Sequence, residues 1–131
     1  FENTAKLKKG DLAVLDFEHY DADQMTHEQA RNFILLYSVR NHGSFPVLYT
    51  GASFINEVLG DKIDNLLSNC PLWIAQYNNK EIKVPPTWND WMLWQYTDGT
   101  NGNEPHYTDG AGNVDRNIFN GSLAELYKFW E

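Results

Sequence analysis

Apolar runs separated by amphipathic segments dominate the first 96 residues of the chain. Short and almost uninterrupted apolar runs occur at 12–17, 45–50, 72–77 and 91–96. Runs of this length without a polar face are typical of strands that are buried on both faces of a parallel sheet. Because helical patterns lie between the runs, the chain is predicted to have an α/β fold, with its strands in a barrel or in a doubly wound sheet.

Helix signals fill the segments between these runs. Residues 26–29, Thr-His-Glu-Gln, have the spacing of a capping box, and apolar residues follow at helical intervals from Ala30 to Tyr37. The Asn-His-Gly sequence at 41–43 is expected to end this helix. A short helix is expected at 52–60, and a helical piece around 63–67 leads into the third apolar run.

The pattern changes after the fourth apolar run. Residues 97–113 contain almost no aliphatic side chains, and the tetrapeptide Tyr-Thr-Asp-Gly occurs at 96–99 and again at 107–110. Asp-Gly favours chain reversal because glycine accepts the positive φ of a hairpin turn, so we expect irregular hairpins here and a strand at 114–119. A calcium loop is the alternative, although the acidic residues lack the alternation of an EF-hand. A capping box begins a C-terminal helix at 122–130.

Composition limits the partners of the chain. The 131 residues carry a formal net charge of −8, which argues against nucleic acid because such binding depends on Lys and Arg. No apolar run approaches the roughly 20 residues that a membrane span needs. Cys70 alone allows no internal disulfide, and His19, His42 and His106 show no short-range metal-ligand spacing. We therefore expect a soluble chain with no metal, no cofactor, and neither a membrane nor a nucleic acid as partner.

The first apolar run ends in two carboxylates, Asp16 and Glu18, separated by Phe17. Residues i and i+2 of a strand point to the same side, and the carboxyl ends of parallel strands are where α/β folds carry their active sites. Two close carboxyl groups raise the pKa of at least one of them. One protonated and one ionised carboxyl group are the equipment for glycoside hydrolysis. The alternative is a pair of solvated acids at a strand end.

Aromatic residues make up 15% of the chain and include five Trp and seven Tyr. They either pack a generous core or line a sugar-binding cleft, since the apolar faces of sugar rings stack on flat aromatic rings. Tyr49, Tyr77 and Tyr96 each fall at the end of an expected parallel strand, on the same rim as Glu18.

Five ordered motifs resemble the glycoside hydrolase family 25 lysozymes, which are the N-acetylmuramidases of phage endolysins and of secreted bacterial and fungal lysozymes. The motifs are VLDFE, PVLYTG, LWIAQY, WQYT and GNVDRNIFNG, and the resemblance runs from about Leu12 to the C-terminus. It implies a flattened barrel of βα units followed by further strands. It also implies cleavage of the β-1,4 bond between N-acetylmuramic acid and N-acetylglucosamine in peptidoglycan, by a protein secreted or released to the bacterial cell wall.

The resemblance also implies roles for individual residues. Glu18 matches the general acid, Asp16 matches the carboxylate two residues before it, and Asp115 matches a late acidic residue that completes the catalytic cleft. The residues matched to the substrate-binding wall are Tyr49, Trp73, Ala75, Tyr77, Gln95 and Tyr96.

The start of the chain departs from the family pattern. Family members open with a Gly-x-Asp-x-Ser strand and two βα units before the Asp-x-Glu strand, and nothing before Leu12 matches them. We therefore expect residues 1–131 to form one catalytic-type domain, a partial flattened barrel that is truncated at its N-terminus relative to the family. The alternative function is a non-catalytic domain that binds cell-wall glycan. An open sheet edge beside Leu12, Val14 and Leu15 predicts self-association, unless the segment from Phe1 to Lys9 covers it.

Overall fold

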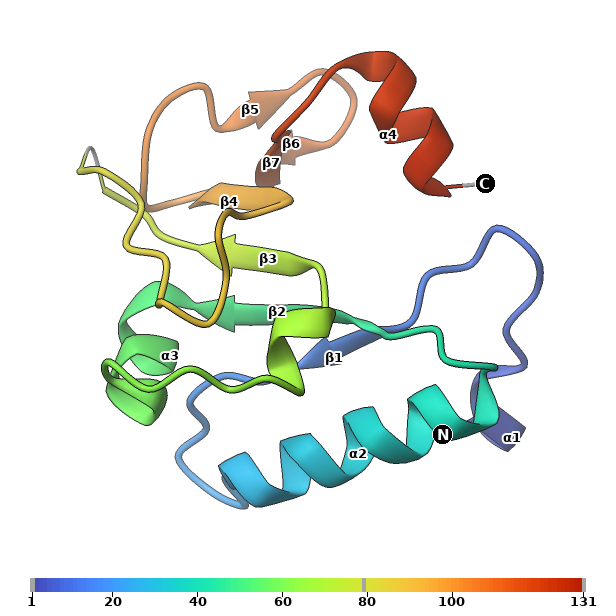
Figure 1. Cartoon of the computed structure of the whole chain (residues 1–131). Helices are drawn as coiled ribbons and strands as arrows, with labels where there is room; N and C mark the ends of the chain where they lie inside the picture. The colour runs from blue at the N-terminus through green and yellow to red at the C-terminus, as the bar shows by residue number, and fades with distance from the viewer. Residues whose placement is uncertain (1, 79, 131) are drawn as a thin grey trace.

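A five-stranded sheet forms the centre of the computed structural model, which describes residues 2–78 and 80–130 (Figure 1). The strand order is β1-β2-β3-β4-β7, in which the first four strands are parallel and β7 is antiparallel to β4. Within the described residues β1 pairs only with β2, so β1 is an edge of the sheet. The strands are β1 (Val14–Asp16), β2 (Val47–Gly51), β3 (Leu72–Ala75), β4 (Leu93–Asp98) and β7 (Asp115–Phe119).

Helices and one small hairpin complete the fold. Figure 1 shows α2 toward the β1 end of the sheet and α4 toward the β7 end. The predicted strands and helices are confirmed, except that the helical piece expected around 63–67 is a turn followed by a 3-10 helix. The remaining elements are α1 (Glu2–Ala5), α2 (His27–Arg40), α3 (Ala52–Leu59), the 3-10 helix η1 (Leu67–Asn69), β5 (Tyr107–Thr108), β6 (Gly112–Asn113) and α4 (Leu123–Trp130).

The local signals in the sequence set the helix ends. At the start of α2, the N–H of Gln29 donates to Thr26 Oγ1 at 3.2 Å, and the N–H of Thr26 donates to Gln29 Oε1 at 2.8 Å. At the start of α4, the N–H of Glu125 donates to Ser122 Oγ at 3.3 Å, and the N–H of Ser122 donates to Glu125 Oε2 at 2.7 Å. Both predicted capping boxes are therefore present, and each satisfies amide groups that the first helical turn leaves without partners.

The first Asp-Gly reversal follows β4. Gly99 has a φ of 84°, and a Cβ atom added there would lie 3.0 Å from the backbone nitrogen of Val114. Glycine thus meets both the conformational and the steric requirement of this reversal. The second Asp-Gly pair forms the turn between β5 and β6, where Gly110 has a φ of 78°.

The hydrophobic core lies on the face of the sheet against which α2, α3 and η1 pack. Alternate residues of the strands project onto this face because successive side chains of a strand point to opposite sides. The buried members include Leu15, Leu48, Leu72 and Ile74 from β1, β2 and β3, Phe17 directly after β1, and Ala30, Ile34, Ile55, Leu59 and Leu67 from the helices.

The opposite face of the sheet is covered only in part within the described residues. Val14, Trp73 and Leu93 line an apolar pocket of about 500 Å³ on this face, together with Leu7 and Trp130. None of the residues of α4 is buried. The parallel strands therefore form an open, partial barrel, as the sequence predicts, and do not close into a complete one.

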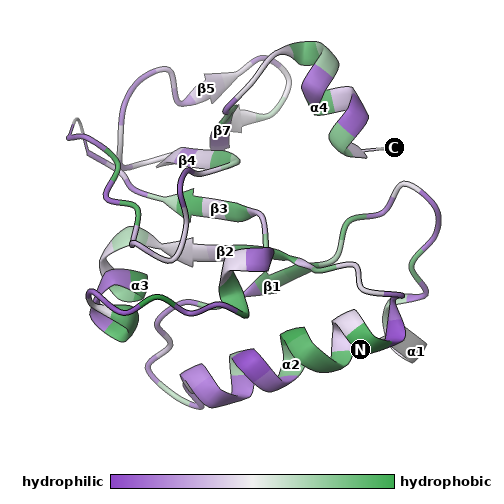
Figure 2. Ribbon diagram, viewed as in Figure 1, coloured by the Kyte–Doolittle hydropathy of each residue, from purple (hydrophilic) through white to green (hydrophobic). Residues whose placement is uncertain are grey.

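Helix α2 exposes apolar side chains to solvent. Figure 2 shows its first half as hydrophilic and its C-terminal half as hydrophobic. Leu35, Leu36 and Val39 are 50%, 56% and 73% exposed. These residues lie on the face of α2 opposite to the one that contributes Ala30 and Ile34 to the core.

Candidate functional site

The two carboxylates at the end of β1 point to the same side of the sheet. Phe17 between them is fully buried in the core, and its ring meets that of Phe54 edge-on at a centroid distance of 5.0 Å. The N–H of Phe17 donates to the carbonyl of Tyr49 at 2.9 Å, which continues the parallel pairing past Asp16. Because Phe17 faces the core, Asp16 and Glu18 face the opposite side.

Glu18 and Asp16 differ in their exposure to solvent. Asp16 is exposed, whereas Glu18 is half-buried. Burial raises the pKa of Glu18 above its usual 4.5, and the negative charge of Asp16 raises it further. The same two carboxylates raise the pKa of Tyr20, whose hydroxyl donates to Asp16 Oδ2 at 3.5 Å. Of the two acids, Glu18 is the one suited to carry a proton.

Four of the predicted site residues form one hydrogen-bonded network beside this pair. The hydroxyls of Tyr49 and Tyr77 both donate to Gln95 Oε1, at 2.7 Å and 2.5 Å. Gln95 in turn donates through Nε2 to Asp115 Oδ2 at 3.0 Å. The network therefore brings together residues from β2, β4 and β7 and from the segment that follows β3.

The network keeps its tyrosine hydroxyls protonated. Burial raises the pKa of Tyr49 far above its usual 10.0, with further contributions from the neighbouring Tyr77 hydroxyl and from the charges of Glu18 and Asp16. Burial also raises the pKa of Tyr77, as do the charges of Asp98, Asp115 and Glu18. Both hydroxyls thus remain hydrogen-bond donors at any physiological pH.

Trp73 and Ala75 are the two residues of β3 that are predicted to line the substrate-binding wall. The Trp73 ring meets that of Tyr49 edge-on at 5.1 Å, and its Nε1 donates to Asn117 Oδ1 at 2.8 Å. Ala75 lines a small pocket of about 310 Å³ together with Glu18 and Tyr77. Asn117 is a member of the wall that sequence reasoning missed. It lies two residues after Asp115 on β7, so the period of two along a strand is the signal that could have found it.

Tyr96, which the sequence also assigns to the substrate-binding wall, makes no hydrogen bond to the network within the described residues, but it lines a pocket of about 580 Å³ together with Asp115 and Asn117. Its hydroxyl donates to the carbonyl of Pro105 at 3.1 Å, and its ring is 6.0 Å from that of Trp94. Tyr96 therefore faces the segment that carries Pro105.

The described residues include neither a metal-ligand cluster nor a membrane-spanning helix. Residues 2–78 and 80–130 contain no group of three or more His, Cys, Asp or Glu side chains arranged to hold a metal ion. In the same part of the chain, no helix has both the length and the apolar character needed to cross a membrane.

Comparisons with known proteins agree with this geometry. The family model for Glycosyl hydrolases family 25 matches residues 1–104. Lysozyme M1 of Streptomyces globisporus is 32% identical in an alignment that covers 86% of this chain and 39% of that protein. An uncharacterized protein of Escherichia coli K12, YegX, is 29% identical in an alignment that covers 98% of this chain and 44% of that protein.

Solved structures show the same fold. The bacterial lysozyme from Streptomyces coelicolor superimposes with a TM-score of 0.64 at 32% identity, covering 86% of this chain and 52% of that one. The muramidase from Acremonium alcalophilum gives a TM-score of 0.65 at 26% identity, covering 89% and 54%. The chain thus spans about half the length of these structures, and somewhat less of the curated relatives that it matches. Since the family model covers most of its residues, the chain belongs to glycosyl hydrolase family 25.

Proposed function

We propose that this chain is a muramidase that hydrolyses the β-1,4 bond between N-acetylmuramic acid and N-acetylglucosamine in peptidoglycan. The observation that carries the proposal is the half-buried Glu18, whose pKa is raised by burial and by Asp16, at the carboxyl end of a parallel strand. Membership of glycosyl hydrolase family 25 and similarity to Lysozyme M1 support the same reaction.

Glu18 acts as the general acid in this proposal. Its protonated carboxyl group gives a proton to the glycosidic oxygen as the bond to the sugar breaks. The Asp16 carboxylate supplies negative charge close to the positive charge that develops on the sugar ring. The configuration of the product depends on whether Asp16, a water molecule or the N-acetyl group of the substrate attacks the ring carbon.

The network beside Glu18 serves to hold the sugar. Tyr49 and Trp73 present aromatic surface for an apolar sugar face, and Asp115 completes the acidic end of the cleft. Gln95 fixes both tyrosine hydroxyls through one carbonyl oxygen, so the wall is organised before substrate arrives. We further propose that the chain acts on the cell wall outside the cell that makes it, as an endolysin or a secreted lysozyme does.

Clearing of purified cell-wall suspensions tests this function. We expect Glu18→Gln to reduce cleavage about a hundredfold or more, because it removes the proton donor and keeps the shape of the side chain. Asp16→Asn should reduce cleavage by a smaller factor. A Glu18→Gln variant that keeps more than a few per cent of the wild-type rate would exclude Glu18 as the acid.

One observation favours a second candidate function. The parallel strands do not close into a barrel within the described residues, and β1 has a free edge beside Asp16. A chain in this form that binds cell walls without clearing them would be a glycan-binding domain. Sedimentation of the protein with insoluble peptidoglycan, measured beside the clearing assay, separates the two functions.

A further inference from the structure

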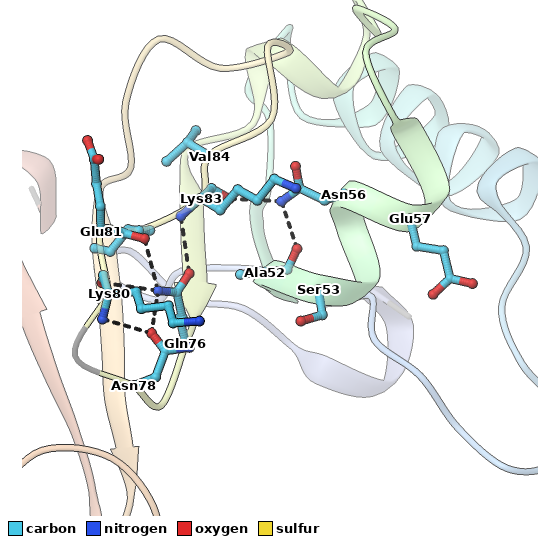
Figure 3. Close-up of a pocket in the computed structure, with 11 residues that line it drawn as sticks. Ala52, Ser53, Asn56, Glu57, Gln76, Asn78, Lys80, Glu81, Lys83 and Val84 are labelled. Atoms are coloured by element: carbon cyan, nitrogen blue, oxygen red, sulfur yellow. Dashed lines mark hydrogen bonds between the residues drawn. The ribbon is translucent and has the colours of Figure 1, made fainter.

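A second hollow adjoins the pocket that contains Glu18. It has a volume of about 830 Å³ and lies between α3 and the segment that follows β3 (Figure 3). Four residues line both hollows, namely Ala52, Ser53, Gln76 and Asn78. The two hollows therefore form one continuous groove that leads away from the proposed general acid. The volume is within the range of pockets that bind small molecules or short peptides.

The wall of this hollow is fixed by side-chain to backbone hydrogen bonds. Gln76 donates through Nε2 to the carbonyl of Glu81 at 3.1 Å and accepts through Oε1 from the N–H of Lys83 at 3.1 Å. Asn56 of α3 donates through Nδ2 to the carbonyl of Lys83 at 2.8 Å and to that of Ala52 at 2.8 Å. Residues 76–84, the segment that follows β3, are thus tied to one another and to α3. The hollow is therefore formed without a ligand.

Two lysines without acidic partners mark the hollow. Lys80 and Lys83 extend from the segment toward α3, while the carboxylates of Glu57 and Glu81 point away from them (Figure 3). Within the described residues, neither lysine has a carboxylate within 4 Å of its ammonium group. The whole chain has ten Lys and Arg against eighteen Asp and Glu. Two cations that line one hollow are therefore available to pair with the carboxylates of a ligand.

We propose that this hollow binds the carboxylate-bearing peptide that is attached to the glycan strand of the substrate, with Lys80 and Lys83 pairing with its carboxylates. The inference rests on the proposed function, because the peptide reaches the hollow only when the sugar lies at Glu18. Peptidoglycan is a glycan that carries short acidic peptides, so a groove leading from the sugar site to two cations matches its chemistry. The chain then distinguishes peptide-bearing glycan from unsubstituted glycan.

Binding measurements with matched ligands and matched variants test the inference. The ligands are a peptidoglycan tetrasaccharide without peptide, the same tetrasaccharide with its peptide, and the peptide-bearing form with its carboxylates amidated. The test variant is Lys80→Ala with Lys83→Ala. The control is Lys62→Ala with Lys128→Ala, which removes the same charge from two exposed lysines outside both hollows.

The wild type and the control are expected to bind the peptide-bearing tetrasaccharide about fivefold more tightly than the peptide-free one, the amount that two exposed ion pairs supply. The test variant should lose this preference, as should the wild type with the amidated ligand. Raising the salt concentration should reduce it in the wild type. Equal preference in the test variant and the control would overturn the inference, as would equal binding of the amidated and free ligands.

The two proposals fail in different ways. If Glu18→Gln cleaves as fast as the wild type while the lysine-dependent preference persists, the proposed general acid is wrong and the peptide site stands. If cleavage depends on Glu18 and the preference is the same in both double variants, the muramidase function stands and the peptide site is wrong.

Discussion

Asp64 and Glu18 are two carboxylic acids with opposite surroundings. The Asp64 side chain is 5% exposed and accepts hydrogen bonds from Arg31, from His27 at 2.7 Å, and from the N–H of Leu66 and of Leu67 at 2.9 Å and 3.1 Å. Burial alone would raise the pKa of Asp64, but these hydrogen bonds outweigh it and lower the pKa below 3.8. Within the described residues the Glu18 carboxylate accepts no such bond, and burial followed by the charge of Asp16 raises its pKa.

Hydrogen-bond partners therefore decide the direction of the pKa shift of Asp64, and burial decides that of Glu18. Asp64 stays ionised and joins α2, through His27 and Arg31, to the turn that leads into η1. Glu18 accepts no such hydrogen bond within the described residues and lines an open pocket, where the proposed function has it give a proton to a substrate oxygen.

The largest difference should appear in stability. We expect Asp64→Asn to lower the free energy of unfolding by about 2 kcal/mol, because it removes the charge that satisfies Arg31 and two backbone N–H groups. Urea denaturation followed by circular dichroism measures this change. Glu18→Gln is the matched comparison, and it should change the stability by no more than about 0.5 kcal/mol. Equal losses in the two variants would contradict the distinction between the two acids.

A smaller difference should appear in the dependence of stability on pH. The pKa of Asp64 is lowered in the folded state, so its contribution is complete above its usual 3.8 and is lost as the pH falls through the lowered value. The pKa of Glu18 is raised, so its contribution is present below 4.5 and is lost as the pH rises through the raised value. Urea titrations at several pH values should therefore show the advantage of wild type over Asp64→Asn shrinking in acid. An advantage that grows in acid would refute this sign.

The smallest effect concerns the open edge rather than either acid. Leu7 lines the apolar pocket on the exposed face beside Val14 and Trp73. A chain that starts at Gly10 loses this cover, and we expect its stability to fall by about 1 kcal/mol and its tendency to self-associate to rise. Light scattering at several concentrations measures the association. A truncated chain that stays monomeric with unchanged stability would show that the edge needs no cover.

Local patterns in the sequence were sufficient to predict most of the fold. The apolar runs predicted the four parallel strands, and the capping boxes at Thr26 and Ser122 predicted the starts of α2 and α4. The helical piece predicted around 63–67 is a turn in which the Asp64 carboxylate accepts from the N–H groups of Leu66 and Leu67, and contacts that are not local also fix this turn. The same carboxylate is held by Arg31 and His27, more than 30 residues earlier in the chain.

The candidate site was only partly predictable for the same reason. Sequence spacing placed Asp16 and Glu18 on one side of a strand, since that relation needs only the period of two. It could not show that Tyr49 and Tyr77 share one acceptor on Gln95, which depends on the register between strands. It also could not show that the Tyr96 hydroxyl donates to the carbonyl of Pro105 and not to the network around Gln95.

A residue-specific carbon NMR titration of the carboxyl groups tests the central claim most directly, because it reports Glu18 and Asp64 in one sample. The account predicts a midpoint above 4.5 for Glu18 and below 3.8 for Asp64. In Asp16→Asn the Glu18 midpoint should move down, since one of the two causes of its rise is gone. A Glu18 midpoint at or below 4.5 in the wild type would contradict the claim that this acid is kept protonated for catalysis.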